Sequence, residues 1–124
     1  MEQIMKKELE SKVQRKCQAL IKENGGFVFK THGDIYTRPG IPDLIACIPT
    51  NVERLKVLIE QGWFKDNKIG IFVGFEIKRE NKLNEVSDAQ KIVGAEIQKA
   101  GGMWYATDDP DLVDGICKLL KGEI

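Results

Sequence analysis

The feature that most constrains the fold of this chain is an apolar segment at residues 69–78 that ends in charge. It reads Ile-Gly-Ile-Phe-Val-Gly-Phe-Glu-Ile-Lys. Successive side chains of a strand point to opposite faces, so the apolar residues at the odd positions share one face. Glu76 and Lys78 then share the other face. The pattern predicts a strand that places a carboxylate beside an ammonium.

A second apolar run, at residues 43–48, opens with Asp43 directly after Pro42. Proline is tolerated at the first residue of a strand, so Asp43 is expected where this strand leaves its turn. If the two strands are neighbours, Asp43, Glu76 and Lys78 meet at one edge of an apolar sheet. Two acids and a lysine at such an edge favour metal-assisted phosphodiester chemistry.

Helical periodicity predicts a first helix over residues 3–23. Its apolar stripe consists of Leu9, Val13, Cys17, Leu20 and Ile21. Glu10 lies within that stripe and is expected to point toward the sheet, where a carboxylate is costly unless it is paired or bound to metal. It is therefore a third candidate acid. A position at the stripe's edge, or a pairing with Lys6 or Gln14, explains Glu10 equally well.

The remaining segments alternate between strand and helix patterns. Strands are expected at 27–31 and 103–107, and a helical insertion at about 50–66. A further helix starts near Ser87, where Gln90 completes a capping box, and the last helix follows Asp109-Pro110. This order predicts an α/β fold with a central mixed sheet flanked by helices.

The length of 124 residues predicts a single domain. No apolar run approaches the roughly 20 residues that span a bilayer, and the N-terminal residues lack the core of a signal peptide. We therefore expect no membrane partner and a cytoplasmic location. Cys17, Cys47 and Cys117 are odd in number and lie in apolar patterns, so they are interpreted as core residues and not as disulfides or zinc ligands.

The formal net charge of zero argues against a nucleic-acid partner, because non-specific DNA affinity comes from neutralising phosphates. A local basic cluster would have to supply the attraction. Six candidates lie in or beside the two strand segments, although solvated loop charges explain any single one of them: Lys30, His32, Arg38, Lys78, Arg79 and Lys82. His32 is the only histidine, which excludes a histidine-metal cluster.

Several motifs together resemble the PD-(D/E)XK nuclease superfamily. They are Gly-Ile-Pro-Asp at 40–43, Glu-Ile-Lys at 76–78, and Gln90 at a helix start. With Glu10-Ser11-Lys12-Val13, and Gly25-Gly26 followed by Lys30, the pattern is closest to the virus-type replication-repair nuclease domain, VRR-NUC. The resemblance reaches about Thr107. It implies one VRR-NUC domain over residues 1–124 with a restriction-endonuclease-like core, from which the long segment between Pro49 and Asn67 departs.

The resemblance implies an Mg²⁺- or Mn²⁺-dependent endonuclease that cuts branched double-stranded DNA, such as four-way (Holliday) junctions, as a homodimer without a small-molecule cofactor. For a viral or prophage protein the location is the bacterial host cytosol. The implied metal ligands are Asp43, Glu76, the backbone carbonyl of Ile77, and Glu10. Lys78 corresponds to the lysine beside the attacking water, and Gln90 to the glutamine that supports that lysine or the scissile phosphate.

Three other functions share parts of this pattern. An archaeal-type Holliday-junction resolvase and a restriction-like duplex endonuclease would use the same catalytic residues. A non-catalytic DNA-binding subunit would keep the fold, but it would not need acids that repel phosphate. Taken alone, Glu76 and Lys78 could also be an ion pair at the end of a strand.

Overall fold

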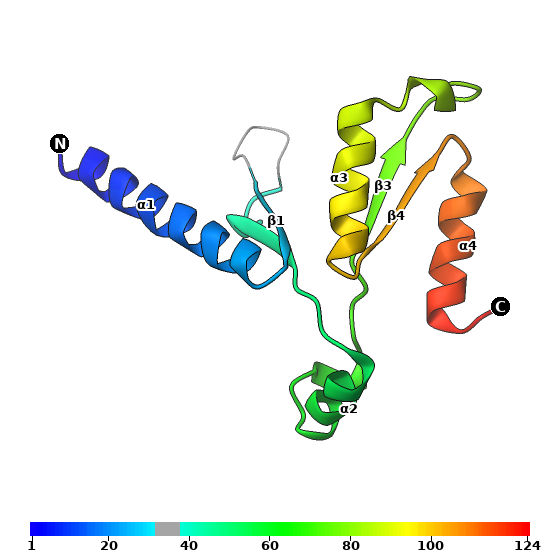
Figure 1. Cartoon of the computed structure of the whole chain (residues 1–124), viewed down its shortest axis with the longest axis horizontal. Coiled ribbons are helices and arrows are strands. Elements are labelled where there is room, and N and C mark those ends of the chain that lie inside the picture. Colours follow the sequence, from blue (N-terminus) through cyan, green and yellow to red (C-terminus); the bar gives the residue numbers. More distant parts are fainter. Residues whose placement is uncertain (32–37) are drawn as a thin grey trace. The chain divides into compact units, whose positions relative to one another are not determined.

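The computed structural model describes residues 1–31 and 38–124 of the chain. These residues form two compact units, Met1–Gly70 and Ile71–Ile124, which are considered separately below. Figure 1 shows helices and strands in both units, and the described residues contain four α-helices and two sheets of two strands each. The predicted α/β class is confirmed.

The first unit consists of a long helix, a hairpin and a short helical segment. Helix α1 spans Glu2–Glu23 and is followed by strands β1 (Phe27–Lys30) and β2 (Leu44–Cys47). The strands are antiparallel, with Phe27 opposite Cys47 and Lys30 opposite Leu44. Gly25 adopts a φ of 80° as the chain leaves α1, a conformation that glycine accepts without steric cost. The helix predicted over 3–23 is thus confirmed to within one residue.

The apolar stripe of α1 is not buried within the first unit. Leu9 and Val13 are 62% and 61% exposed, and Leu20 is 48% exposed. The half-buried side chains of α1 are Ser11, Gln14, Gln18 and Ile21, of which only Ile21 belongs to the apolar stripe. The prediction that the apolar stripe is buried is wrong for this unit taken by itself, because two four-residue strands cover only a narrow part of the helix. Among the described residues, no helix combines the length and apolar character needed to cross a bilayer.

The helical insertion expected at about 50–66 is helix α2, Val52–Glu60, followed by the 3-10 turn η1, Lys65–Asn67. The side chain of Asn51 caps α2 by accepting a hydrogen bond from the backbone N–H of Arg54 at 2.7 Å. Asparagine is among the preferred N-cap residues, because its side-chain oxygen reaches the N–H three residues on. Trp63, which follows α2, is 72% exposed.

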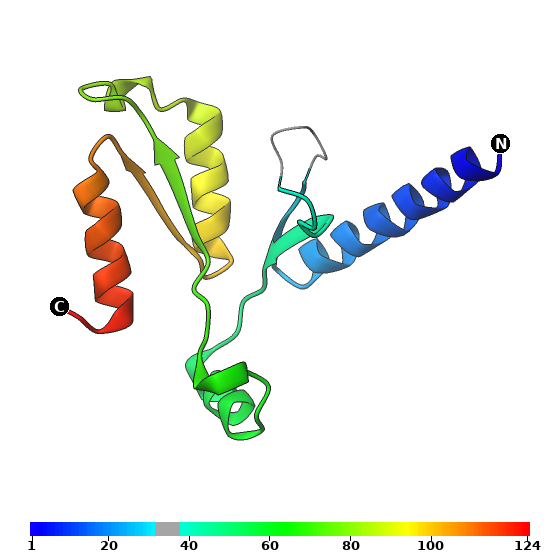
Figure 2. The ribbon, with the colours of Figure 1, turned by 180° about the vertical axis from the view of Figure 1, so that it is seen from behind.

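The second unit contains a parallel strand pair and two helices (Figure 2). Its elements are β3 (Val73–Ile77), the 3-10 turn η2 (Leu83–Glu85), α3 (Asp88–Lys99), β4 (Met103–Thr107) and α4 (Pro110–Lys121). Val73 pairs with Met103 and Ile77 with Thr107. Strand β3 is shorter than the predicted 69–78 segment, because β4 begins only at Met103 and offers no earlier ladder partner.

The small core of this unit lies between α3 and one face of the strand pair. Ile97 and Ala100 of α3 are 5% and 2% exposed. Gly74 and Gly94 leave room for this packing, since a Cβ at Gly74 would lie 3.1 Å from Ile97 and one at Gly94 would overlap the ring of Trp104. The even-numbered positions of β3 therefore face α3.

The predicted start of the last helix is confirmed. Asp109 caps α4 by accepting a hydrogen bond from the N–H of Asp111 at 2.9 Å, and Pro110 occupies the first turn. Proline is suited to this position, because the N–H that it lacks would have no partner within the helix.

The three cysteines differ in exposure, and this difference predicts their reactivity. Cys47 is buried and burial raises the pKa of its thiol, whereas Cys17 and Cys117 are exposed, contrary to the expectation that all three are core residues.

Because the thiolate is the reactive form, a raised pKa means less nucleophile at pH 8. We expect iodoacetamide to label Cys17 and Cys117 quickly and Cys47 at least about tenfold more slowly. Peptide mass spectrometry over a time course measures this, and equal rates in the folded protein would contradict the burial of Cys47.

Candidate functional site

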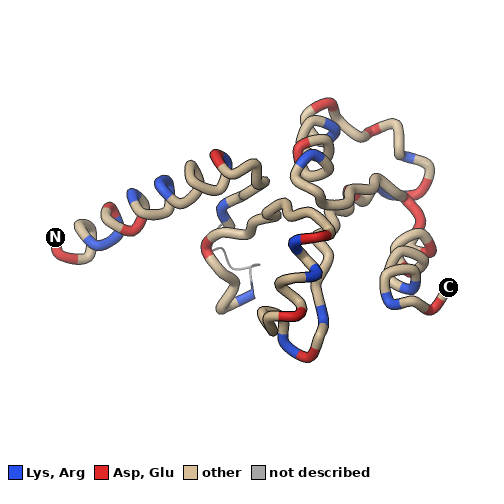
Figure 3. Tube along the Cα trace, turned by 60° about the horizontal axis from the view of Figure 1, so that its bottom comes forward, with Lys and Arg blue, Asp and Glu red and all other residues tan. Residues whose placement is uncertain are grey.

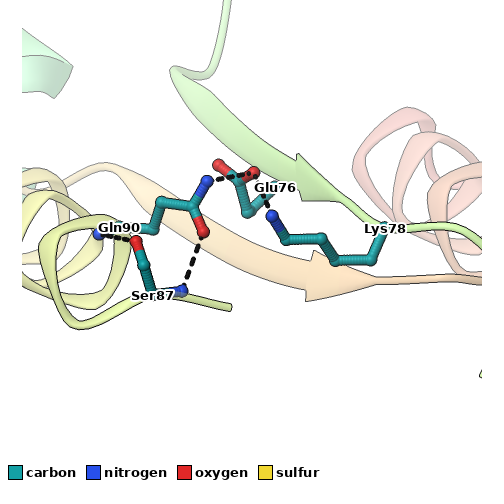
Figure 4. Close-up of polar contacts among 4 residues, drawn as sticks. All are labelled: Glu76, Lys78, Ser87 and Gln90. Atoms are coloured by element: carbon teal, nitrogen blue, oxygen red, sulfur yellow. Dashed lines mark hydrogen bonds and ion pairs between the residues drawn. The ribbon is translucent and has the colours of Figure 1, made fainter. Parts of the chain in front are cut away.

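Glu76, Lys78 and Gln90 form one polar cluster in the second unit (Figure 4). The Gln90 amide nitrogen Nε2 donates a hydrogen bond to Oε1 of Glu76 at 2.8 Å. Lys78 Nζ lies 3.5 Å from the same carboxylate oxygen. The cluster therefore joins the C-terminal end of β3 to the first turn of α3.

Strand alternation brings Glu76 and Lys78 together, as the sequence predicts. Both residues lie at even positions, on the face where Gly74 contacts Ile97 of α3. The shared face is thus confirmed, and the start of α3 adds Gln90 to it.

The capping box predicted at the start of α3 is also confirmed. Gln90 Oε1 accepts a hydrogen bond from the backbone N–H of Ser87 at 2.9 Å, and the N–H of Gln90 donates to Ser87 Oγ at 3.1 Å. The capping box, which depends on neighbouring residues alone, thus explains the position of the Gln90 side-chain oxygen. The hydrogen bond from the Gln90 side-chain nitrogen to Glu76 joins residues 14 positions apart, and no local pattern in the sequence indicates it.

The cluster is partly withdrawn from water. The side chain of Lys78 is 18% exposed and that of Glu76 is 28% exposed. Partial burial strengthens the attraction between the two charges relative to a fully exposed pair. The hydrogen bond from Gln90 and the approach of Lys78 both involve Oε1, and within the described residues no hydrogen bond is made to Oε2 of Glu76. One carboxylate oxygen is therefore available to a ligand.

The backbone carbonyl of Ile77 is a second available oxygen. Lys78 N–H donates to Thr107 C=O at 3.0 Å, and Phe72 C=O accepts from Met103 N–H at 3.0 Å. Backbone groups of alternate residues point to opposite edges of a strand, so the even residues of β3 bond toward β4 and Ile77 points the other way. That edge of β3 carries no partner strand within the second unit.

Asp43 and Glu10 belong to the first unit. Asp43 lies one residue before β2, and its backbone C=O accepts a hydrogen bond from Thr31 N–H at 3.0 Å. Its carboxylate is exposed and makes no hydrogen bond or ion pair with the residues that the structure describes, and Glu10 is exposed on α1. Within either unit, the described residues contain no group of three acidic, histidine or cysteine side chains that could hold a metal. The meeting of Asp43 and Glu10 with Glu76 stays a prediction.

The predicted phosphate-binding residues are mostly exposed. Lys30 and Arg38 are exposed in the first unit, while His32 lies outside the described residues. In the second unit Lys82 is half-buried, and the exposed guanidinium of Arg79 lies 3.6 Å from Glu85. Figure 3 shows basic and acidic residues interspersed along the chain, in agreement with its zero net charge.

The loop after β3 is tied to the end of β4 by a contact that the sequence did not indicate. The N–H of Asn81 donates to the carboxylate of Asp108 at 2.9 Å, and Asn81 has a φ of 64°. Asparagine tolerates this left-handed conformation better than most residues. The contact holds the Arg79–Lys82 segment beside the C-terminal ends of the two strands.

Comparison with protein-family models, with curated proteins and with solved structures found no match to this chain.

Proposed function

We propose that this protein is a divalent-metal-dependent endonuclease of the VRR-NUC type, with a restriction-endonuclease-like core, that hydrolyses phosphodiester bonds in branched DNA such as four-way junctions. The observation that carries the proposal is the half-buried cluster of Glu76, Lys78 and Gln90 at the end of β3. In this cluster a carboxylate with one oxygen available to a cation lies beside a fixed ammonium, an arrangement that suits metal-assisted hydrolysis of a phosphodiester.

The donor atoms in the second unit suit a hard cation. The available Oε2 of Glu76 and the carbonyl of Ile77 are both oxygen ligands, which Mg²⁺ prefers, and Mg²⁺ retains several waters when only one or two carboxylates bind it. The proposal requires the carboxylate of Asp43 as a second acid and Glu10 as a third. A bound Mg²⁺ or Mn²⁺ would supply an activated water and neutralise charge on the scissile phosphate.

Lys78 supplies a positive charge that stays in place without the cation. Its ammonium is held near Glu76 with little access to water. A cation fixed in this way stabilises the negative charge that develops on a phosphate during attack, and it needs no reorganisation to do so. We assign Lys78 this catalytic role. Lys30, His32, Arg38, Arg79 and Lys82 are proposed to contact the DNA backbone.

Removal of either central carboxylate is expected to weaken metal binding. Glu76→Gln and Asp43→Asn each exchange a charged oxygen ligand for a neutral amide, and we expect each to lower Mn²⁺ affinity at least about tenfold. Isothermal titration calorimetry measures this directly. Glu96→Gln is the matched control, because Glu96 is exposed on α3, away from its first turn. Unchanged affinity in both site variants would refute these ligand assignments.

The direct test of the function is cleavage of an end-labelled four-way junction beside linear duplex and single strand of the same sequence. Each substrate is incubated with Mg²⁺, with Mn²⁺ or with EDTA. Metal-dependent cutting confined to the junction supports the proposal, and paired cuts on opposite strands support a homodimer, because two sites must act across a two-fold axis. Cutting of the duplex alone would favour a restriction-like enzyme. Binding without cutting of any substrate would favour a non-catalytic DNA-binding subunit.

A further inference from the structure

We infer that Gln90 is a positioning residue that makes Glu76 a monodentate ligand, one that binds a cation through a single oxygen. In this way Gln90 sets the preference of the site for small divalent cations over Ca²⁺. This inference rests on the proposed metal-dependent function.

The orientation of the Gln90 amide is determined by chemistry. Its carbonyl oxygen accepts from the Ser87 N–H at 2.9 Å, so its NH₂ group is the end that faces Glu76 at 2.8 Å (Figure 4). Exchanging the two ends would set NH₂ against an N–H donor and a carbonyl against a carboxylate, which is two repulsive contacts. The capping box therefore aims a hydrogen-bond donor at the carboxylate.

Glu76 Oε1 is occupied from two directions. Gln90 Nε2 donates to it from α3, and Nζ of Lys78, the residue directly after β3, lies 3.5 Å away. A carboxylate oxygen has about two lone-pair sites, of which the hydrogen bond from Gln90 uses one, and the nearby Lys78 ammonium repels a cation that approaches the same oxygen. A cation that took both oxygens of Glu76 would have to displace Gln90, Lys78 or both. The carboxylate is thus arranged to bind through Oε2 alone.

One-oxygen binding discriminates between ions. Mg²⁺ needs near-octahedral geometry and keeps several waters, whereas Ca²⁺ takes six to eight ligands and often binds a carboxylate through both oxygens. A carboxylate held to a single oxygen suits the first kind of ion. Loss of the Gln90 donor would free Oε1 and favour Ca²⁺.

The test measures the affinities of Mn²⁺ and Ca²⁺ by calorimetry in the absence of DNA, so it needs no cleavage. In the wild-type protein we expect Mn²⁺ to bind at least about tenfold more tightly than Ca²⁺, and in Gln90→Met we expect that ratio to fall about tenfold. Methionine is similar in length to glutamine and lacks the amide. Equal affinities for the two ions in the wild type would overturn the inference without any variant.

Ser87→Ala is the matched control for helix stability. It removes the hydroxyl that accepts from the Gln90 N–H, but it keeps the backbone N–H that orients the Gln90 side chain. We expect a lower unfolding midpoint and an unchanged Mn²⁺/Ca²⁺ ratio. If Ser87→Ala changes the ratio as much as Gln90→Met does, or if folded Gln90→Met keeps the wild-type ratio, Gln90 acts only as a cap and the inference fails.

The two proposals fail in different ways. Suppose that the wild-type protein binds Mn²⁺ and cuts junctions, and that Gln90→Met keeps the wild-type Mn²⁺/Ca²⁺ ratio. This result would overturn the role of Gln90 and leave the nuclease function intact. Wild-type protein that binds neither ion would overturn both proposals.

Discussion

Replacing Lys78 with alanine is expected to lower the rate of junction cleavage by about a thousandfold while leaving DNA binding nearly unchanged. The substitution removes a fixed, partly desolvated positive charge beside the reacting phosphate. In well-studied enzymes, removing one such stabilising group lowers kcat by about a hundredfold to a thousandfold. The Lys78 side chain is only 18% exposed, so solvent screens its charge less than that of a surface lysine. Binding, in contrast, depends on many phosphate contacts, of which Lys78 is one.

Single-turnover cleavage with saturating protein separates the chemical step from binding, which is measured independently by gel shift in Ca²⁺ or EDTA. Lys91→Ala is the matched control, because Lys91 is an exposed lysine on α3 next to Gln90 in sequence. We expect wild-type cleavage from that variant. Full activity of Lys78→Ala would show that Glu76 and Lys78 form only a structural ion pair, and the proposed catalytic role would be withdrawn.

Gly94→Ala is expected to destabilise the second unit by about 1–3 kcal/mol, although alanine is the better helix former. A Cβ at this position would lie 2.6 Å and 2.8 Å from Cε2 and Cε3 of the Trp104 ring. Separations this short force the ring or the helix to move. Since Trp104 stands on β4 and Gly94 on α3, the movement disturbs the packing that holds α3 against the strand pair.

Gly115→Ala, in the same unit, is expected to have the opposite effect and to raise stability. Gly115 lies inside α4, and a Cβ there would meet no atom within 4 Å. Without a clash, only the backbone effect remains, and we expect a stabilisation of about 0.4–1 kcal/mol. Urea titration followed by tryptophan fluorescence and by far-UV circular dichroism measures both variants. If Gly94→Ala left stability unchanged or raised it, as Gly115→Ala is expected to do, the close approach of α3 to Trp104 would be incorrect.

Features that depend on the period of the backbone could be predicted from the sequence. The helix over 3–23, the capping box at Ser87 and the shared face of Glu76 and Lys78 were all predicted and are present. Each depends on residues at most a few turns apart, where the geometry of one helix or one strand sets the relation between side chains. The meeting of Asp43 and Glu10 with Glu76 stays a prediction, since it involves residues far apart in sequence.

Features that depend on which surfaces meet were decided only by the tertiary structure. The bond from Gln90 to Glu76, the fit of Trp104 over Gly94, and the exposure of Leu9 and Val13 have no signature in local pattern. Because backbone geometry repeats along the chain, the order of residues is enough to predict where helices and strands form and which side chains each element presents together. The hydrogen bond from the amide of a helix cap to the carboxylate of a neighbouring strand could not be predicted in this way, because it depends on how closely two elements pack in three dimensions.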